Sequence, residues 1–189
     1  MITTDEVIHH ARNREYMSGI ERDKARTKAT GEVFTPTPLV QEILGQLAKQ
    51  DQEIFTDPTK TFLDPSCGDG QFLAEVLIRK MEAGSTFEQA LSTIYGVDLM
   101  PDNVKLCQDR LLCGQKHLRK IVERNIVCAD ALKYHYRFDR SPCDPESGSF
   151  DPKMDPELLA KINSIPEPTK QLDSKTPLQP ANTGLFEGL

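Results

Sequence analysis

Residues 61–81 constrain the fold of this 189-residue chain more than any other stretch. A short apolar run at 61–63 leads into a polar turn that contains Gly68 and Gly70. Apolar residues then recur at helical spacing, namely Phe72, Leu73, Val76, Leu77 and Met81. A strand that leads through a glycine-containing turn into a helix is typical of the first βα unit of a nucleotide-binding sheet. The two glycines allow a ligand to approach the backbone closely.

Two later segments predict further strands of the same sheet. Residues 93–100 contain several β-forming residues and place Asp98 near the end of the strand, and Pro101 opens the following helix. Residues 121–128 are a third strand candidate, which leads into Asp130. Strands that alternate with helices in this way predict an α/β domain with a parallel sheet.

The region before the sheet predicts two helices of different character. Residues 1–29 are polar and locally basic. We interpret them as a solvated helix of mixed charge, with a contact to a DNA backbone or a partner protein as the alternative. Residues 39–49 predict a second helix with Thr37 as its N-cap. Its expected buried residues are Val40, Ile43, Leu44 and Leu47.

The charge balance limits how this chain can contact nucleic acid. Its net charge at neutral pH is −6. Autonomous DNA-binding domains usually carry a basic surface, because neutralisation of phosphates supplies most of their non-specific affinity. Contacts with DNA are therefore expected to be local, to come from another subunit, or to be absent.

The N-terminus and the cysteines exclude further classes of protein. The sequence has no apolar run long enough to span a membrane and no signal-peptide pattern, so we expect a cytoplasmic protein without membrane contact. The five cysteines include no Cys-x-x-Cys pair. They indicate neither a disulfide framework nor a zinc site, and no metal is expected. We interpret Cys67 as a small packing residue.

The turn at residues 64–73, DPSCGDGQFL, resembles the cofactor loop of the N6-adenine (more broadly amino-) DNA methyltransferases. The pattern of that family is close to D-P-x-C-G-x-G-x-F-L. The resemblance implies a Rossmann-like, S-adenosylmethionine-dependent fold, in which a doubly wound parallel sheet carries helices on both faces. It also implies that S-adenosylmethionine, as the cofactor, contacts this loop. The implicated residues are Asp64, Pro65, Ser66, Gly68 and Gly70.

A second segment, TGEVFTP at residues 30–36, resembles the G-x-x-[FY]-T-P segment of the same family. The matching positions are Phe34 and Thr35. The resemblance implies that they contact the methionine end of the cofactor. A motif order with this segment ahead of the cofactor loop is typical of the gamma group and of type I modification subunits.

Two turns at strand ends extend the resemblance. Asp98, together with Leu99, matches the second motif of the family. A carboxylate at the end of the second strand can accept hydrogen bonds from two ribose hydroxyls. Apart from the resemblance, Asp98 also fits the role of an acid placed beside a helix dipole. Asp130, together with Ala131, matches the third motif, whose aspartate accepts a hydrogen bond from the exocyclic amine of adenine.

The catalytic motif of the family, [DNS]-P-P-[FYW], has no match in this sequence. In the family, this motif holds the target amine and stacks on the flipped base. The sequence contains no Pro-Pro pair, and Ser141-Pro142 is only a degenerate remnant, so the catalytic residues are unknown. The resemblance is thus truncated before this motif and implies an incomplete sheet with an exposed edge. We expect the C-terminal tail, self-association or a second protein chain to cover that edge.

These patterns divide the chain into three parts. Residues 1–29 form an N-terminal helical and polar segment. Residues 30–140 form the methyltransferase-like domain that binds S-adenosylmethionine. Residues 141–189 hold eight of the thirteen prolines and are expected to be a largely flexible tail.

The implied function is that of the cofactor-binding part of a DNA adenine-N6 methyltransferase, of the kind found in restriction–modification systems. The reaction would be a direct in-line attack by the amine of the base, with the catalytic motif supplied by a partner chain. The alternative is a non-catalytic methyltransferase-like subunit, or a decoy, that acts through protein partners. A decayed fragment that binds no cofactor is a third hypothesis. The sequence leaves open whether the isolated chain is an active enzyme.

Overall fold

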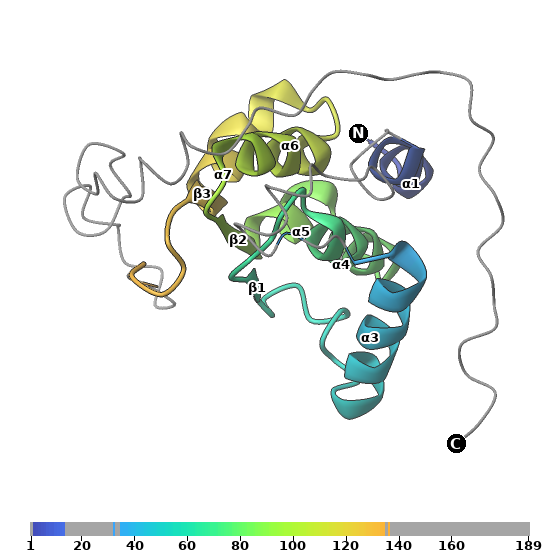
Figure 1. The fold of residues 1–189 in the computed structure, drawn as a ribbon. Coiled ribbons are helices and arrows are strands. Elements are labelled where there is room, and N and C mark those ends of the chain that lie inside the picture. Colours follow the sequence, from blue (N-terminus) through green and yellow to red (C-terminus); the bar gives the residue numbers. More distant parts are fainter. Residues whose placement is uncertain (1, 14–31, 33–34, 135, 137–189) are drawn as a thin grey trace, which may run out of the picture.

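Three short parallel strands form the sheet of this α/β protein (Figure 1). The computed structural model describes residues 2–13, 32, 35–134 and 136. Strand β1 (Phe62–Asp64) pairs with β2 (Ile94–Asp98), which pairs with β3 (Ile126–Cys128). The strand at 62–64, the strand at 94–98 and their parallel pairing agree with the sequence prediction. The carboxyl ends of all three strands consequently lie at one edge of the sheet.

The helices that directly follow the first two strands pack together on the sheet. Helix α4 (Gln71–Glu82) follows β1, and α6 (Pro101–Leu112) follows β2. They pack against each other and against the strands that precede and follow them. The largest fully buried apolar side chains come mainly from these helices and strands: Leu73, Leu77, Ile78, Ile94, Leu111 and Ile126. Because α4 and α6 share one face of the sheet, helices on its second face remain a prediction.

The N-terminal helix is part of the core, contrary to the sequence prediction. Helix α1 (Thr4–Asn13) packs against α4 and α6, and the side chains of Val7 and Ala11 are buried. The solvated-helix interpretation is therefore wrong for residues 4–13. Val7 and Ala11 lie one turn apart, so they share the side of α1 that packs against α4 and α6, and Arg12 pairs with the buried Glu75 of α4 at 2.8 Å.

Helix α3 (Thr37–Gln50) begins one residue earlier than the capping prediction requires. Pro36 occupies the N-cap position, and no side chain caps the helix. The hydroxyl of Thr37 instead accepts a hydrogen bond from the Gln71 side chain. Val40 and Leu44 are buried as expected, whereas Ile43 is 41% exposed.

The third strand is shorter than predicted, because a helix occupies most of residues 121–128. The 3-10 turn η1 (Lys116–Leu118) and helix α7 (Arg119–Asn125) precede β3. Leu118, Val122 and Asn125 are buried at helical spacing, which explains why these residues form a helix. The adjacent β-branched residues at 121–122 gave a misleading strand signal.

Helix α5 (Phe87–Ser92) has a capping box that provides a first testable prediction. The Thr86 hydroxyl accepts from the Gln89 amide at 3.2 Å, and the Gln89 side chain accepts from the Thr86 amide at 2.9 Å. We expect Thr86→Ala to lower the free energy of unfolding by about 1 kcal/mol, measured by urea denaturation. Thr86→Ser is the control, because it keeps a hydroxyl. An equal loss in both variants would contradict the capping role.

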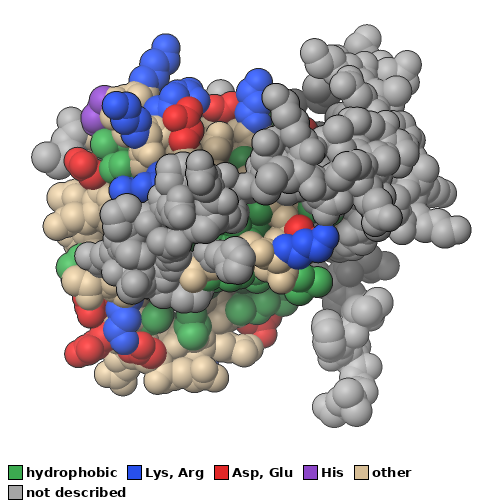
Figure 2. Space-filling view, turned by 90° about the vertical axis from the view of Figure 1, so that its left-hand side faces the viewer, with side chains coloured by type: hydrophobic (Ala, Val, Ile, Leu, Met, Phe, Trp, Pro, Cys, Tyr) green, Lys and Arg blue, Asp and Glu red, His purple; other side chains and the backbone are tan. Residues whose placement is uncertain are grey.

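None of the helices in the described part of the chain is long and apolar enough to cross a membrane. Lys and Arg side chains lie among Asp and Glu side chains over the described portion of the face drawn in Figure 2. This distribution agrees with the net charge of −6 and gives that portion of the face no broad basic area for a phosphate backbone.

Candidate functional site

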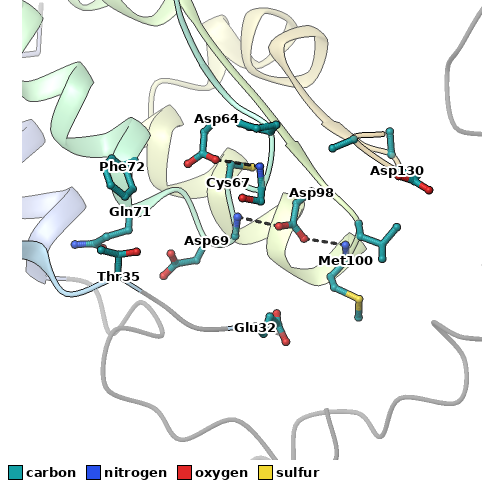
Figure 3. Close-up of a pocket in the computed structure, with 16 residues that line it drawn as sticks. Glu32, Thr35, Asp64, Cys67, Asp69, Gln71, Phe72, Asp98, Met100 and Asp130 are labelled. Carbon is teal, nitrogen blue, oxygen red and sulfur yellow. Dashed lines mark hydrogen bonds between the residues drawn. The ribbon is translucent and has the colours of Figure 1, made fainter. Parts of the chain in front are cut away.

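A cavity of about 340 Å³ lies where the three strands end (Figure 3). Its wall is built from the turn after β1 (64–69), the turn after β2 (98–100) and the turn after β3 (129–131). Glu32 and Thr35 close it from the segment before α3, and Gln71 and Phe72 contribute from the start of α4. The volume falls within the range of small-molecule sites, and the edge of the sheet is the usual place for one in an α/β fold.

Hydrogen bonds within the turn after β1, and one from the turn to β2, hold this turn in place. Asp64 accepts from the Ser66 amide at 3.0 Å, and the Cys67 amide donates to the Val97 carbonyl at 3.0 Å. The Gly70 amide donates to the Cys67 carbonyl at 2.8 Å. These bonds hold the turn against β2, so its backbone faces the cavity in one conformation.

Gly70 is not among the residues that line the cavity and lies against Cys107 of α6. Its φ of 85° is in the left-handed region, which favours glycine. A Cβ at this position would lie 2.7 Å from the Cys107 sulfur. The glycine is therefore required by the close approach of α6 to the turn.

The Asp98 carboxylate accepts hydrogen bonds from three protein donors. Its Oδ2 accepts from the Gly68 amide at 2.9 Å, and its Oδ1 accepts from the Met100 amide at 2.8 Å (Figure 3). The side chain of Asn103 also donates to Oδ1, at 3.2 Å, and to Glu32 at 2.5 Å. Burial raises the pKa of Asp98, while the hydrogen bonds from Met100 and Gly68 oppose that shift. The three donors thus orient a partly desolvated carboxylate.

The turn after β3 brings a further carboxylate to the cavity. Asp130 accepts from the Leu132 amide at 2.9 Å, and the Lys133 ammonium lies 3.8 Å from it. The Ala129 amide donates to the Asp98 carbonyl at 3.0 Å, which ties this turn to the turn after β2. The two aspartates consequently lie on adjacent, mutually bonded turns.

The lining of the cavity is strongly acidic. Glu32, Asp64, Asp69, Asp98 and Asp130 all contribute, and no Lys, Arg or His is among the described residues that line it. Burial also raises the pKa of Asp64, and the nearby Asp98 carboxylate adds to that shift. A wall of this charge favours ligands that carry positive charge or hydroxyl donors and disfavours phosphates. It therefore differs from the phosphate-binding glycine loops of dinucleotide sites.

Most of the predicted cofactor residues line this cavity. Nine of the eleven do so: Thr35, Asp64, Pro65, Ser66, Gly68, Asp98, Leu99, Asp130 and Ala131. Gly70 lies against Cys107 and does not line the cavity, and Phe34 lies outside the described residues. Ser141 and Pro142 also lie outside them. What each lining residue binds stays a prediction.

Sequence reasoning assigned no cofactor-binding role to the remaining lining residues, which are Glu32, Cys67, Asp69, Gln71, Phe72, Met100 and Ala129. All of them lie within or beside the motifs already described, so proximity in sequence was the available signal. Cys67 is buried, and its hydrogen bond to Cys107 together with burial raises the pKa of its thiol. It is one of four cysteines in the described part of the chain, none of which forms a disulfide.

Comparisons with known proteins agree with the arrangement of the motifs. The model of a family described as N-6 DNA Methylase matches residues 19–142. The type II methyltransferase M.VspI of Vibrio sp. (strain 343) is 29% identical over 136 residues, which cover 69% of this chain and 28% of that protein. The matched region thus spans less than a third of this relative. No solved structure matches significantly.

Proposed function

Because the chain belongs to the N-6 DNA methylase family, we propose that it provides the S-adenosylmethionine-binding part of a DNA adenine-N6 methyltransferase. The observation that carries this proposal is the acidic cavity at the ends of the three strands, with Asp98 held by three donors. S-adenosylmethionine supplies a methyl group for transfer to an amine when it is bound. It carries a sulfonium, an ammonium and two ribose hydroxyls, which suit a wall of carboxylates.

We assign the two ends of the cavity to the two ends of this cofactor. Asp98 accepts hydrogen bonds from the ribose, and Asp130 accepts one from the adenine amine. Thr35, Gln71 and Asp69 form the other end, where the methionine moiety is placed. These assignments follow the family resemblance and the order of the turns in Figure 3, where Thr35 and Gln71 lie opposite Asp130.

Glu32 is proposed as a second acceptor for the ribose. A carboxylate offers about four acceptor positions, and three of those of Asp98 are taken by protein donors. A second ribose hydroxyl then needs another acceptor or the displacement of a protein donor. Asn103 brings Glu32 and Asp98 to the same amide, so the Glu32 carboxylate lies close to where that hydroxyl is placed.

The residues that hold the target amine are proposed to lie on a further stretch of polypeptide, in the same or another chain. The 189 residues contain no Pro-Pro pair. Within the described part, the chain orients the methyl donor but offers no recognised group that contacts a flipped base. The rate enhancement then depends on assembly, because positioning of the amine relative to the methyl group dominates such transfers.

The test is a calorimetric titration of the purified 189-residue chain with S-adenosylmethionine. We expect saturable binding at one site and a marked loss of affinity in Asp98→Ala. Adenosine triphosphate serves as a control ligand, because its phosphates are expected to be repelled by the acidic wall. Absence of binding to the wild-type chain would refute the proposal.

A second candidate function is that of a non-catalytic subunit or decoy that acts through protein partners. The net charge of −6 and the mixed surface charge favour it over independent DNA binding. The two functions differ in one outcome. A cofactor-binding part of an enzyme restores methyl transfer to DNA when the complementary segment is added, whereas a decoy binds partners without restoring transfer.

A further inference from the structure

A buried arginine of α6 contacts residues that line the proposed cofactor cavity and also contacts helix α1. Arg110 belongs to α6 and is 3% exposed. Its Nε donates to the Ala11 carbonyl of α1 at 3.1 Å, and its Nη1 lies 3.2 Å from the Asp69 carboxylate. Its Nη2 donates to the Gln71 side chain. Arg110 does not line the cavity itself, but Asp69 and Gln71 do.

A further hydrogen bond links Gln71 to the first residue of α3. The amide nitrogen of the Gln71 side chain donates to the Thr37 hydroxyl. Thr37 is the first residue of α3 and lies two positions after Thr35, which closes the cavity. A continuous series of contacts thus links Arg110, Gln71 and Thr37 to one end of the cavity.

We propose that Arg110 is a positioning residue that sets the shape of this end of the cavity. A guanidinium carries five donors in one plane and stays charged, so it can bond a carbonyl, a carboxylate and an amide oxygen at the same time. The three acceptors contact three different nitrogens of the guanidinium, whereas the donors of lysine all lie on one nitrogen, which cannot reach the three positions at once. Replacement of Arg110 therefore allows Asp69 or Gln71 to move within the wall.

At the opposite end of the cavity, other residues hold the Asp98 and Asp130 side chains in place. Asp98 is held by Gly68, Met100 and Asn103, and Asp130 is held by Leu132 and Lys133. None of these bonds passes through Arg110. Figure 3 separates the ends in space, with Thr35 and Gln71 on one side and Asp130 on the other. Arg110 is therefore expected to affect binding of the methionine moiety and to leave binding of the adenosine moiety largely unchanged.

This inference rests on the proposed function, and two ligands separate the two claims. The intact chain is titrated with S-adenosylmethionine and, separately, with adenosine. In Arg110→Lys we expect the dissociation constant for S-adenosylmethionine to rise roughly tenfold, which corresponds to the loss of one charge-assisted hydrogen bond. The dissociation constant for adenosine should stay within about twofold, since a change of that size is well below one hydrogen bond.

A milder variant keeps the test valid if Arg110→Lys folds poorly. Thr37→Val removes the hydroxyl that accepts from Gln71 and changes no buried charge. We expect it to weaken binding of S-adenosylmethionine but not of adenosine. Arg79→Lys is the matched control, because Arg79 donates to the Gln41 carbonyl at 2.7 Å and is not among the residues that line the cavity. It should change neither affinity.

Two results would overturn the inference while the proposed function stands. In one, the wild type binds S-adenosylmethionine and both variants bind it equally well. In the other, the variants lose affinity for adenosine and S-adenosylmethionine to the same extent, which is the result expected of a purely structural role. A wild-type chain that binds adenosine but not S-adenosylmethionine would refute both claims.

Discussion

Gly70→Ala is expected to lower the free energy of unfolding by about 2–5 kcal/mol. Two costs add at this position. The φ of 85° is unfavourable for any residue with a Cβ, at about 1–2 kcal/mol. The new Cβ would also lie 2.7 Å from the Cys107 sulfur and 3.3 Å from its Cβ, so α6 or the turn must move, at about 1–3 kcal/mol.

The same substitution is expected to weaken S-adenosylmethionine binding. The Gly70 amide donates to the Cys67 carbonyl, and Gly70 is the N-cap of α4, so its displacement moves the turn after β1, which lines the cavity. A loss of roughly tenfold in affinity corresponds to one disrupted charge-assisted hydrogen bond. Urea denaturation measures the stability, and calorimetric titration measures the affinity.

Gly84→Ala is the matched control for both measurements. Gly84 has a φ of 103°, but a Cβ added there would meet nothing within 4 Å, and the residue is not among those that line the cavity. It should show the conformational cost of about 1–2 kcal/mol and no change in affinity. Equal destabilisation by the two substitutions would show that the contact with Cys107 contributes nothing.

Local motifs made the turns that line the cavity and two of the strands predictable from sequence. Residues 64–70 carry their own turn chemistry, with Asp64 bonding two residues ahead and glycine at the positive φ. Residues 94–98 are β-forming and are followed by Pro101, which opens a helix. Each of these signals lies within a few residues, so the surrounding fold did not have to be known.

The features that sequence reasoning missed depend on partners that are distant in the chain. The burial of Val7 and Ala11 depends on packing against α4 and α6, which the spacing of the two residues does not reveal. Residues 121–125 form a helix because Val122 and Asn125 find a buried side, although neighbouring β-branched residues favour a strand.

The Arg110 contacts were likewise beyond a local pattern. Its bond to Ala11 joins positions 99 residues apart, and its bond to Gln71 joins positions 39 residues apart. A charged residue within an amphipathic helix normally indicates a solvated face. Helical spacing places Arg110 on the same side of α6 as Asn103 and Cys107, but it does not show which acceptors the buried charge meets there.

Asp98→Asn is expected to raise the dissociation constant for S-adenosylmethionine by roughly tenfold to a hundredfold at neutral pH. The amide keeps the shape of the side chain but loses the charge that strengthens a bond from a ribose hydroxyl. It also turns one acceptor into a donor that faces the amide of Gly68 or Met100, which are only 2.9 and 2.8 Å from the present carboxylate.

Acidification is expected to weaken cofactor binding by the wild-type chain before it affects ordinary aspartates. Burial raises the pKa of Asp98 above its usual 3.8, so protonation of the free protein begins at a higher pH than in an exposed carboxylate. In the proposed function the ionised form accepts the ribose hydroxyls, and affinity is therefore expected to fall as the pH drops through the raised pKa. Calorimetric titration at a series of pH values measures this slope, which should be shallower in Asp98→Asn.

The sign of the stability change separates this effect from acid unfolding. A folded-state pKa raised above the unfolded value means that the folded protein holds its proton more tightly. The contribution of Asp98 to stability is thus greatest below its unfolded pKa and is lost as the pH rises through the folded-state pKa. Lower pH therefore weakens cofactor binding, whereas the protonation of Asp98 favours folding.

Burial also raises the pKa of Asp64. The Asp98→Asn variant should therefore keep a residual pH dependence of affinity, which the further substitution Asp64→Asn removes. Equal slopes in the wild type and Asp98→Asn would contradict the role of Asp98 as the titrating acceptor.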